Sequence, residues 1–141
     1  MVDNVKYVVV DLDGTLVRTD LFVESLLRYL KGNPFRIFQL AMWLLKGRAF
    51  AKEKVAENVD IDAEYLPYEE ALIGYLKQLK TDGKEIILAT ASHQKYANQV
   101  AEHLGIFDKV MATSGENNLK GDNKLAAIQK LLGDEEFAYA G

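Results

Sequence analysis

The 141-residue sequence contains no cysteine and has no apolar run long enough to cross a bilayer. Without cysteine the chain can form neither a disulfide framework nor a thiolate zinc site, which fits a reducing compartment. The longest nearly continuous apolar stretch, Phe35–Leu45, is shorter than the roughly 20 residues that a membrane-spanning helix needs. No N-terminal apolar run resembles a signal peptide. We therefore expect a cytoplasmic soluble domain.

Charge is unevenly distributed along the chain, whose net charge is −4. Residues 21–54 hold seven basic and two acidic side chains, whereas the remainder holds 10 basic and 19 acidic side chains. The acidic remainder argues against nucleic-acid binding. The basic and apolar insert is a candidate surface for an anionic partner.

Short apolar runs alternate with helical patterns over most of the chain. The runs that predict strands are Tyr7–Val10, Glu85–Ala89, Lys109–Ala112 and Phe137–Ala140. One helix is predicted from Pro67 to Gly83, through Leu72, Tyr75, Leu76 and Leu79. A second follows Ser92 and ends at Gly105. A third follows Asn123 and ends at Gly133, through Leu125, Ile128, Leu131 and Leu132. This alternation predicts an α/β, Rossmann-like three-layer fold, with a parallel sheet whose strand order is 4-1-2-3.

About fifty residues after the first strand carry no strand pattern. Helices are predicted there over Leu21–Leu30, Pro34–Leu45 and Phe50–Val59, with Asn33 as the N-cap of the second. We interpret residues 19–65 as a small helical cap, and residues 1–18 and 66–141 as the core. The apolar stripe of the second helix has two interpretations. It is either the core of the cap or an exposed face, rimmed by lysine and arginine, for a membrane surface, a partner domain or a lipid-phosphate substrate.

Two aspartates follow the first strand directly. Asp11 lies at its carboxyl end, where open parallel sheets place their sites, and Asp13 is two positions on, on the same side of an extended backbone. Gly14 permits a sharp turn, in which Thr15 can satisfy backbone groups, and we expect both residues to contribute to phosphate binding. Because the two carboxylates repel each other, they predict a hard cation, Mg²⁺ by preference. One carboxylate can attack phosphorus while the other acts as general acid and base.

Two further segments supply candidate donors for phosphoryl oxygens. The second strand ends in Thr90, Ala91 and Ser92 and opens directly into a helix, so a hydroxyl and free backbone N–H groups converge there. Lys124 can bring an ammonium to the same place, and nearby Lys120 is the alternative. His93 and His103 lie ten residues apart without a third ligand, so we interpret both as surface residues.

These motifs resemble those of the haloacid dehalogenase superfamily. DLDGTL at Asp11–Leu16 resembles its motif I, ILATAS at Ile87–Ser92 its motif II, and the lysine within KGDNKLAAI its motif III. The resemblance implies that Asp11 is the nucleophile, Asp13 the acid/base, Thr90 the phosphate-binding hydroxyl and Lys124 the charge-neutralising lysine. It further implies that Asp11 and the backbone carbonyl of Asp13 bind Mg²⁺ under a C1 cap. Dehalogenases lack the second aspartate, so phosphoryl chemistry is expected.

A closer resemblance extends over nearly the whole chain. The segments DLDGTLVRTDLFVESLL, LATASH and GENNLKGDNK…FAYAG are similar to the soluble N-terminal domain of UbiA-type membrane prenyltransferase fusions. This resemblance implies a C-terminal prenyltransferase domain and tethering to the inner membrane. The superfamily's motif IV is a strand followed by acids that complete the magnesium site. Phe137–Gly141 resembles that strand and no acid follows it, so we expect a domain truncated after the fourth strand and weakly active or inactive by itself.

The sequence thus predicts an Mg²⁺-dependent phosphatase, which hydrolyses a small-molecule or lipid phosphate monoester through an aspartyl phosphate. A phosphotransferase or phosphomutase on the same scaffold is one alternative. A docking or regulatory domain that positions a membrane enzyme, without chemistry of its own, is another. A receiver domain fits poorly, because neither the second aspartate nor the large cap has a purpose there.

Overall fold

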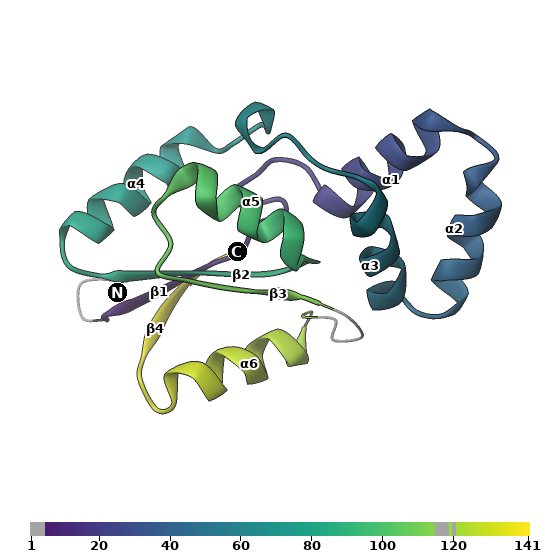
Figure 1. The fold of residues 1–141 in the computed structure, drawn as a ribbon. Helices are drawn as coiled ribbons and strands as arrows, with labels where there is room; N and C mark the ends of the chain where they lie inside the picture. The colour runs from purple at the N-terminus through teal and green to yellow at the C-terminus, as the bar shows by residue number, and fades with distance from the viewer. Residues whose placement is uncertain (1–4, 115–118, 120) are drawn as a thin grey trace.

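A computed structural model describes residues 5–114, 119 and 121–141 of the chain (Figure 1). In this described part, one sheet contains the parallel strands β1 (Tyr7–Val10), β2 (Glu85–His93), β3 (Lys109–Thr113) and β4 (Phe137–Ala140). The strand order is β3-β2-β1-β4, and Val8 is in register with Ile86 on one side and Ala138 on the other. The predicted α/β class and strand order are confirmed.

The central strand β1 is apolar throughout because helices cover both faces of the sheet. Val8 and Val10 pack in the cluster that contains residues of α4 (Glu70–Thr81) and α5 (Gln94–Leu104). Val9, whose side chain points the opposite way, packs against Ile128 of α6 (Asp122–Leu132). Figure 1 shows α4 and α5 on one face and α6 on the other. This three-layer packing fixes the direction in which β1 delivers Asp11.

Helix α4 begins later than predicted. Residues 67–69 stay extended because Arg18 N donates to Pro67 O at 2.9 Å and Glu69 N donates to Leu16 O at 2.9 Å, which pairs this segment with the loop after β1. Pro67 therefore precedes the helix and is not part of its first turn. The buried face of α4 carries Ile73, whereas Tyr75 is 49% exposed.

Helix α6 has both buried and exposed leucine and isoleucine side chains. Ile128 and Leu132 are buried against Val9. Leu125 and Leu131 are respectively 49% and 37% exposed. Leu125 instead lies beside Phe137 and Tyr139 in a surface pocket at the β4 edge, where no further described strand covers it.

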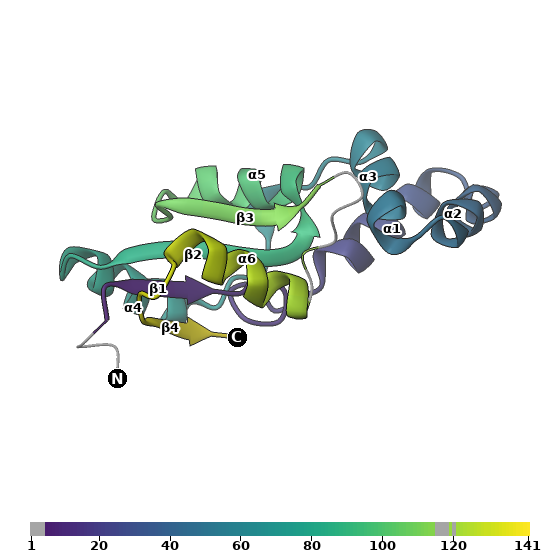
Figure 2. The same ribbon diagram turned by 90° about the horizontal axis from the view of Figure 1, so that it is seen from below.

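Residues 21–58 form three helices beyond the carboxyl ends of the strands, and we call this unit the cap (Figure 2). Its helices are α1 (Leu21–Gly32), α2 (Arg36–Leu45) and α3 (Arg48–Asn58), followed by a short 3-10 helix, η2 (Ala63–Tyr65). Asp20 caps α1 by accepting hydrogen bonds from two backbone N–H groups. Asn33 was predicted as the N-cap of α2, but Phe35 occupies that position; the Asn33 side chain accepts from Phe35 N instead.

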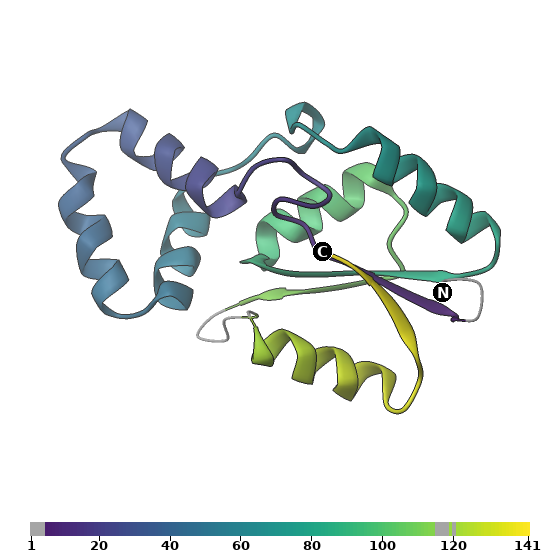
Figure 3. The same cartoon turned by 180° about the vertical axis from the view of Figure 1, so that it is seen from behind.

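The cap is held together by one small cluster of buried residues. Tyr29, Leu40, Val55 and Val59 form it, and the Tyr29 ring lies 5.3 Å from that of Trp43. Among the residues of α2, only Leu40 is buried, because α2 packs on α1 and α3 with one side and forms the outer edge of the cap (Figure 3). The structure therefore favours the second interpretation of the α2 stripe, an exposed apolar face.

Helix α3 joins the cap to the core. Lys52 Nζ donates to Ala91 O at 2.7 Å, and Tyr96 Oη donates to Val59 O at 2.8 Å. His93 Nε2 lies 2.5 Å from Glu53 Oε2, while its Nδ1 accepts from Lys95 N. With a side chain only 11% exposed, His93 is a cap–core contact and not the predicted surface residue. No helix among the described residues is long and apolar enough to cross a bilayer.

Candidate active site

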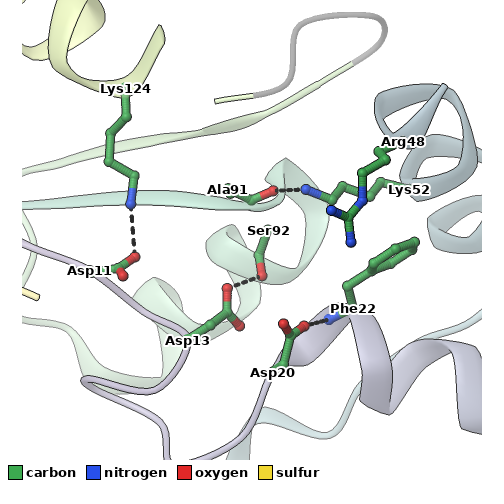
Figure 4. Close-up of a pocket in the computed structure, with 9 residues that line it drawn as sticks. All are labelled: Asp11, Asp13, Asp20, Phe22, Arg48, Lys52, Ala91, Ser92 and Lys124. Carbon is green, nitrogen blue, oxygen red and sulfur yellow. Dashed lines mark hydrogen bonds and ion pairs between the residues drawn. The ribbon is translucent and has the colours of Figure 1, made fainter. Parts of the chain in front are cut away.

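A pocket of about 220 Å³ opens where the carboxyl ends of β1 and β2 face the cap (Figure 4). The core lines it with two aspartates that follow β1, with the end of β2 and with one lysine of α6. The cap and its N-terminal flank line the opposite wall. The lining residues are Asp11, Asp13, Ala91, Ser92 and Lys124 from the core, and Asp20, Phe22, Arg48 and Lys52 from the cap side.

Asp11 is held by the end of β1 and by a lysine from another layer. Its backbone N donates to Ala140 O at 2.8 Å, which continues the pairing of β1 with β4. Its Oδ1 accepts from Leu12 N at 2.8 Å and from Lys124 Nζ at 3.0 Å. No described residue donates to Oδ2 of Asp11. The carboxylate is thus fixed through one oxygen, and the other can meet a ligand in the pocket.

Asp13 is held through both of its oxygens. Oδ1 accepts from Leu21 N at 2.8 Å, and Oδ2 accepts from Ser92 Oγ at 2.7 Å. Burial raises the pKa of Asp13 above its ordinary value; the hydrogen bonds from Leu21 and Ser92 oppose this rise, and the charges of Asp20 and Asp11 add to it. Asp13 therefore holds a proton at a higher pH than an exposed aspartate does, as a general acid requires.

Thr90 lies behind the pocket wall, whereas Ser92 reaches it. Thr90 is fully buried and does not line the pocket; its Oγ1 accepts from Ser92 N at 3.0 Å and lies 3.4 Å from Asp13 Oδ2. Ser92 and Ala91 reach the pocket wall. In this structure Thr90 orients the aspartate and the β2 end. Its role as the phosphate-binding hydroxyl stays a prediction.

The remaining predicted residues support the loop or carry the positive charge. Gly14 adopts a φ of 73°, a conformation that favours glycine, and Thr15 N donates to Leu12 O at 3.3 Å in the same turn. Neither residue lines the pocket. Lys124 lies in the first turn of α6 and its side chain is 14% exposed. Lys120, the alternative lysine, lies outside the described residues.

Four residues of the pocket wall were not predicted from the sequence: Asp20, Phe22, Arg48 and Lys52. The Lys52 ammonium lies 5.7 Å from the centre of the Phe22 ring in addition to its bond with Ala91 O. Arg48 is exposed at the start of α3. The basic composition of residues 21–54 was the available signal, but only the folded cap shows which of its basic side chains turn toward the aspartates.

The oxygen donors of the pocket fit a hard divalent cation. Asp11 offers a carboxylate oxygen, the backbone carbonyl of Asp13 is the second candidate ligand, and no histidine is among the lining residues. Mg²⁺ is commonly bound through one or two carboxylates, with water and substrate oxygens completing its six ligands. Within the described part of the chain, no group of three or more histidine, aspartate or glutamate residues is placed to hold a metal. Asp11 and Asp13 therefore fit Mg²⁺ as part of its ligand set.

Sequence comparisons match almost the whole chain to known proteins. Residues 5–141 match the hydrolase family described as haloacid dehalogenase-like hydrolase. The uncharacterized protein y4nM of Sinorhizobium fredii (strain NBRC 101917 / NGR234) is 34% identical over 131 residues, which are 93% of this chain and 25% of that protein. The chain thus spans about a quarter of the length of this curated relative.

Solved structures share the fold at low sequence identity. A phosphoserine phosphohydrolase-like protein from Francisella tularensis has a TM-score of 0.61 at 17% identity, with coverage of 95% of this chain and 76% of that one. A substrate-bound phosphoserine phosphatase has a TM-score of 0.57 at 17% identity, with 96% and 77% coverage. L-2-haloacid dehalogenase from Xanthobacter autotrophicus has a TM-score of 0.57 at 17% identity, with 96% and 69% coverage. These likenesses establish the fold alone.

Proposed function

The chain belongs to the haloacid dehalogenase-like hydrolase family, and from this premise we propose that it hydrolyses phosphate monoesters through an aspartyl phosphate. The observation that carries the proposal is a pair of unlike carboxylates in one pocket. Asp11 is paired with the Lys124 ammonium, whereas burial raises the pKa of Asp13. Two aspartates in such different surroundings can serve as nucleophile and as acid/base.

The proposed reaction divides into two proton-balanced steps. In the first, Asp11 attacks phosphorus through its carboxylate, and protonated Asp13 gives its proton to the leaving alkoxide as the P–O bond breaks. In the second, Asp13 takes a proton from the water that attacks phosphorus of the aspartyl phosphate; the bond between phosphorus and the Asp11 oxygen breaks, which releases inorganic phosphate and returns Asp11 to its carboxylate form. Lys124 holds Asp11 in place at 3.0 Å and offsets negative charge beside it.

Mg²⁺ is part of this proposal, and the carboxylate of Asp11 and the backbone carbonyl of Asp13 would hold it. When bound, it would supply positive charge that reduces the repulsion between the Asp11 carboxylate and the phosphoryl oxygens. Residues at the end of β2 position Asp13 and line the pocket. Ser92 Oγ holds Asp13 by a 2.7 Å hydrogen bond, and the β2 end presents the backbone at Ala91 and Ser92.

The cap wall supports a substrate with both an apolar and an anionic part. Phe22 offers an aromatic surface and Arg48 an exposed guanidinium on the side opposite Asp11 (Figure 4). We place the leaving group of the substrate against this wall, because the aspartates and Lys124 occupy the other one. A small-molecule or lipid phosphate with a second negative group suits these side chains.

Replacement of the nucleophile tests the mechanism. In the full-length gene product, Asp11→Asn is expected to lower turnover of p-nitrophenyl phosphate with Mg²⁺ by about 10³-fold or more, because an amide cannot form the acyl phosphate. Asp134→Asn is the matched control, since Asp134 is exposed and remote from the pocket. Wild-type turnover in Asp11→Asn would refute the mechanism. Phosphorylated alcohol as the main product, when an alcohol acceptor is added, would identify a phosphotransferase instead.

We further infer that this domain is part of a larger membrane protein with a UbiA-type prenyltransferase domain, tethered to the inner membrane. The support is the likeness of the quoted segments to that fusion and the length of the Sinorhizobium relative, of which the chain covers 25%. Fractionation of cells that express the full-length gene product checks this inference. Recovery of the intact product in the supernatant after ultracentrifugation would contradict it.

A further inference from the structure

Helix α2 presents one continuous apolar face to the solvent. Phe35, Phe38, Met42 and Leu45 are respectively 77%, 71%, 64% and 88% exposed, and we call these four residues the α2 face. Their spacing of three, four and three residues places them on one side of the helix. Leu40, on the other side, is 5% exposed and packs on Tyr29 and Val55. The exposed residues therefore do not contribute to the cap core.

The α2 face lies in a stretch without negative charge. Residues 25–52 contain six basic and no acidic side chains, although the chain as a whole has a net charge of −4. Lys31 and Arg36 flank one end of the face and Lys46 flanks the other, and all three residues are exposed. An apolar strip with cations at both ends is complementary to a surface that is apolar beneath a layer of negative charge.

The α2 face is separate from the catalytic pocket. None of the residues that line the pocket belongs to α2. Figures 1 and 3 show α2 at the edge of the cap that is farthest from the sheet, and α1 and α3 lie between α2 and the sheet. The face is therefore not a subsite for the leaving group, and its occupant approaches from outside the molecule.

We propose that the α2 face docks on the surface of an anionic lipid bilayer. Phe35, Phe38, Met42 and Leu45 enter the boundary between headgroups and acyl chains, while Lys31 and Lys46 meet lipid phosphates. A bilayer fits better than a protein groove for two reasons. The four apolar side chains carry no hydrogen-bonding group that would fix a register, and the complete lack of acids over residues 25–52 suits a surface of uniformly negative charge.

Vesicle co-sedimentation tests this proposal without reference to phosphatase activity. The wild-type chain is expected to bind phosphatidylcholine vesicles that contain phosphatidylserine, and to bind pure phosphatidylcholine about tenfold more weakly. Phe38→Glu is expected to weaken binding to the anionic vesicles by about tenfold or more, because it puts a charge into the apolar face. The control is Tyr75→Glu, which alters an exposed aromatic residue of α4, outside the α2 face. This variant is expected to bind the vesicles as the wild type does.

A second pair of variants tests the charges. The double change Lys31→Glu and Lys46→Glu is expected to abolish the preference for anionic vesicles, whereas Lys77→Glu on α4 is expected to retain it. Circular dichroism and thermal melting establish that every variant is folded.

Three results would overturn the proposal. The first is a wild-type chain that does not sediment with anionic vesicles, and the second is a folded Phe38→Glu variant that binds them as the wild type does. The third is a lipid-independent dimer that Phe38→Glu dissociates, since a second copy of the chain would then cover the face.

Discussion

Strand β1 and helix α2 are both short and strongly apolar, yet the fold treats them in opposite ways. Val8, Val9 and Val10 are at most 3% exposed, whereas all of α2 except Leu40 and the partly buried Trp43 is exposed. The strand has a neighbouring strand on each side and helices on both faces. The helix has neighbours on one side alone. Burial thus depends on how many elements pack around a segment, and not on its hydrophobicity.

The same two regions differ in how they use charge. At the end of β1, each charged group has a fixed partner: Lys124 for Asp11, and Ser92 with Leu21 N for Asp13. Beside α2, Lys31 at the end of α1 and Lys46 after the last residue of α2 are exposed to solvent. Fixed partners suit chemistry that requires defined geometry, and exposed like charges suit a diffuse anionic surface.

Removal of Lys124 tests whether its ammonium group contributes to turnover. Lys124→Ala should lower kcat/KM for p-nitrophenyl phosphate by about 10²–10³-fold, because a charged donor close to the nucleophile is lost. Lys130→Ala, on the exposed part of the same helix, should leave it unchanged. Equal rates for the two variants would show that the Asp11–Lys124 pair has no part in turnover.

Truncation of one apolar side chain in each region measures the difference in packing. Ile87→Ala should lower the free energy of unfolding by about 2–5 kcal/mol, because Ile87 is 1% exposed and packs on α6 through Ile128. Phe38→Ala, at a side chain that is 71% exposed, should change it by less than about 0.5 kcal/mol. Urea unfolding followed by circular dichroism gives both values. Similar losses in both variants would mean that α2 is packed in solution.

Replacement of Arg48 tests whether the cap contributes to substrate recognition. Arg48→Ala should raise KM by about tenfold for phosphate monoesters that carry a second anionic group, and should leave kcat for p-nitrophenyl phosphate nearly unchanged. The control is Lys54→Ala, a cap lysine that does not line the pocket. Steady-state kinetics with both substrate types is the measurement. A fall in kcat with an unchanged KM would contradict the assignment of Arg48 to the leaving group.

The smallest expected effect is on stability and comes from Asp13. Because burial raises its pKa in the folded chain, ionisation costs more in the folded than in the unfolded state. Its contribution to stability is thus greatest below the unfolded pKa and is lost as the pH rises through the folded pKa. Asp13→Asn should accordingly raise the melting temperature at neutral pH, and the gain should disappear in acid. Thermal melts across this pH range check the sign, and a variant that melts lower at neutral pH would contradict it.

The core was predictable because its signals are local. The run Tyr7–Val10 predicted a buried strand with the bounds that the structure shows, and DLDGTL placed Asp11 and Asp13 at its end. The starts of α2 and α4 were wrong because long-range hydrogen bonds hold residues 67–69 extended and because Asn33 bonds within its own turn. The exposure of Tyr75 and Leu125 depends on whether a neighbouring helix or strand covers these side chains. The spacing of apolar residues along the sequence does not contain that information.

Sequence alone determined where the two aspartates lie: an apolar strand must end at the edge of a parallel sheet, and the acids encoded after it must lie there. Only the tertiary structure decided which distant groups meet those acids. Lys124 reaches Asp11 across 113 positions, Ser92 rather than Thr90 lies at the pocket wall, and Arg48 and Lys52 enter from the cap. The physical reason is that contacts between layers depend on the packing of whole helices, and no short stretch of sequence contains that information.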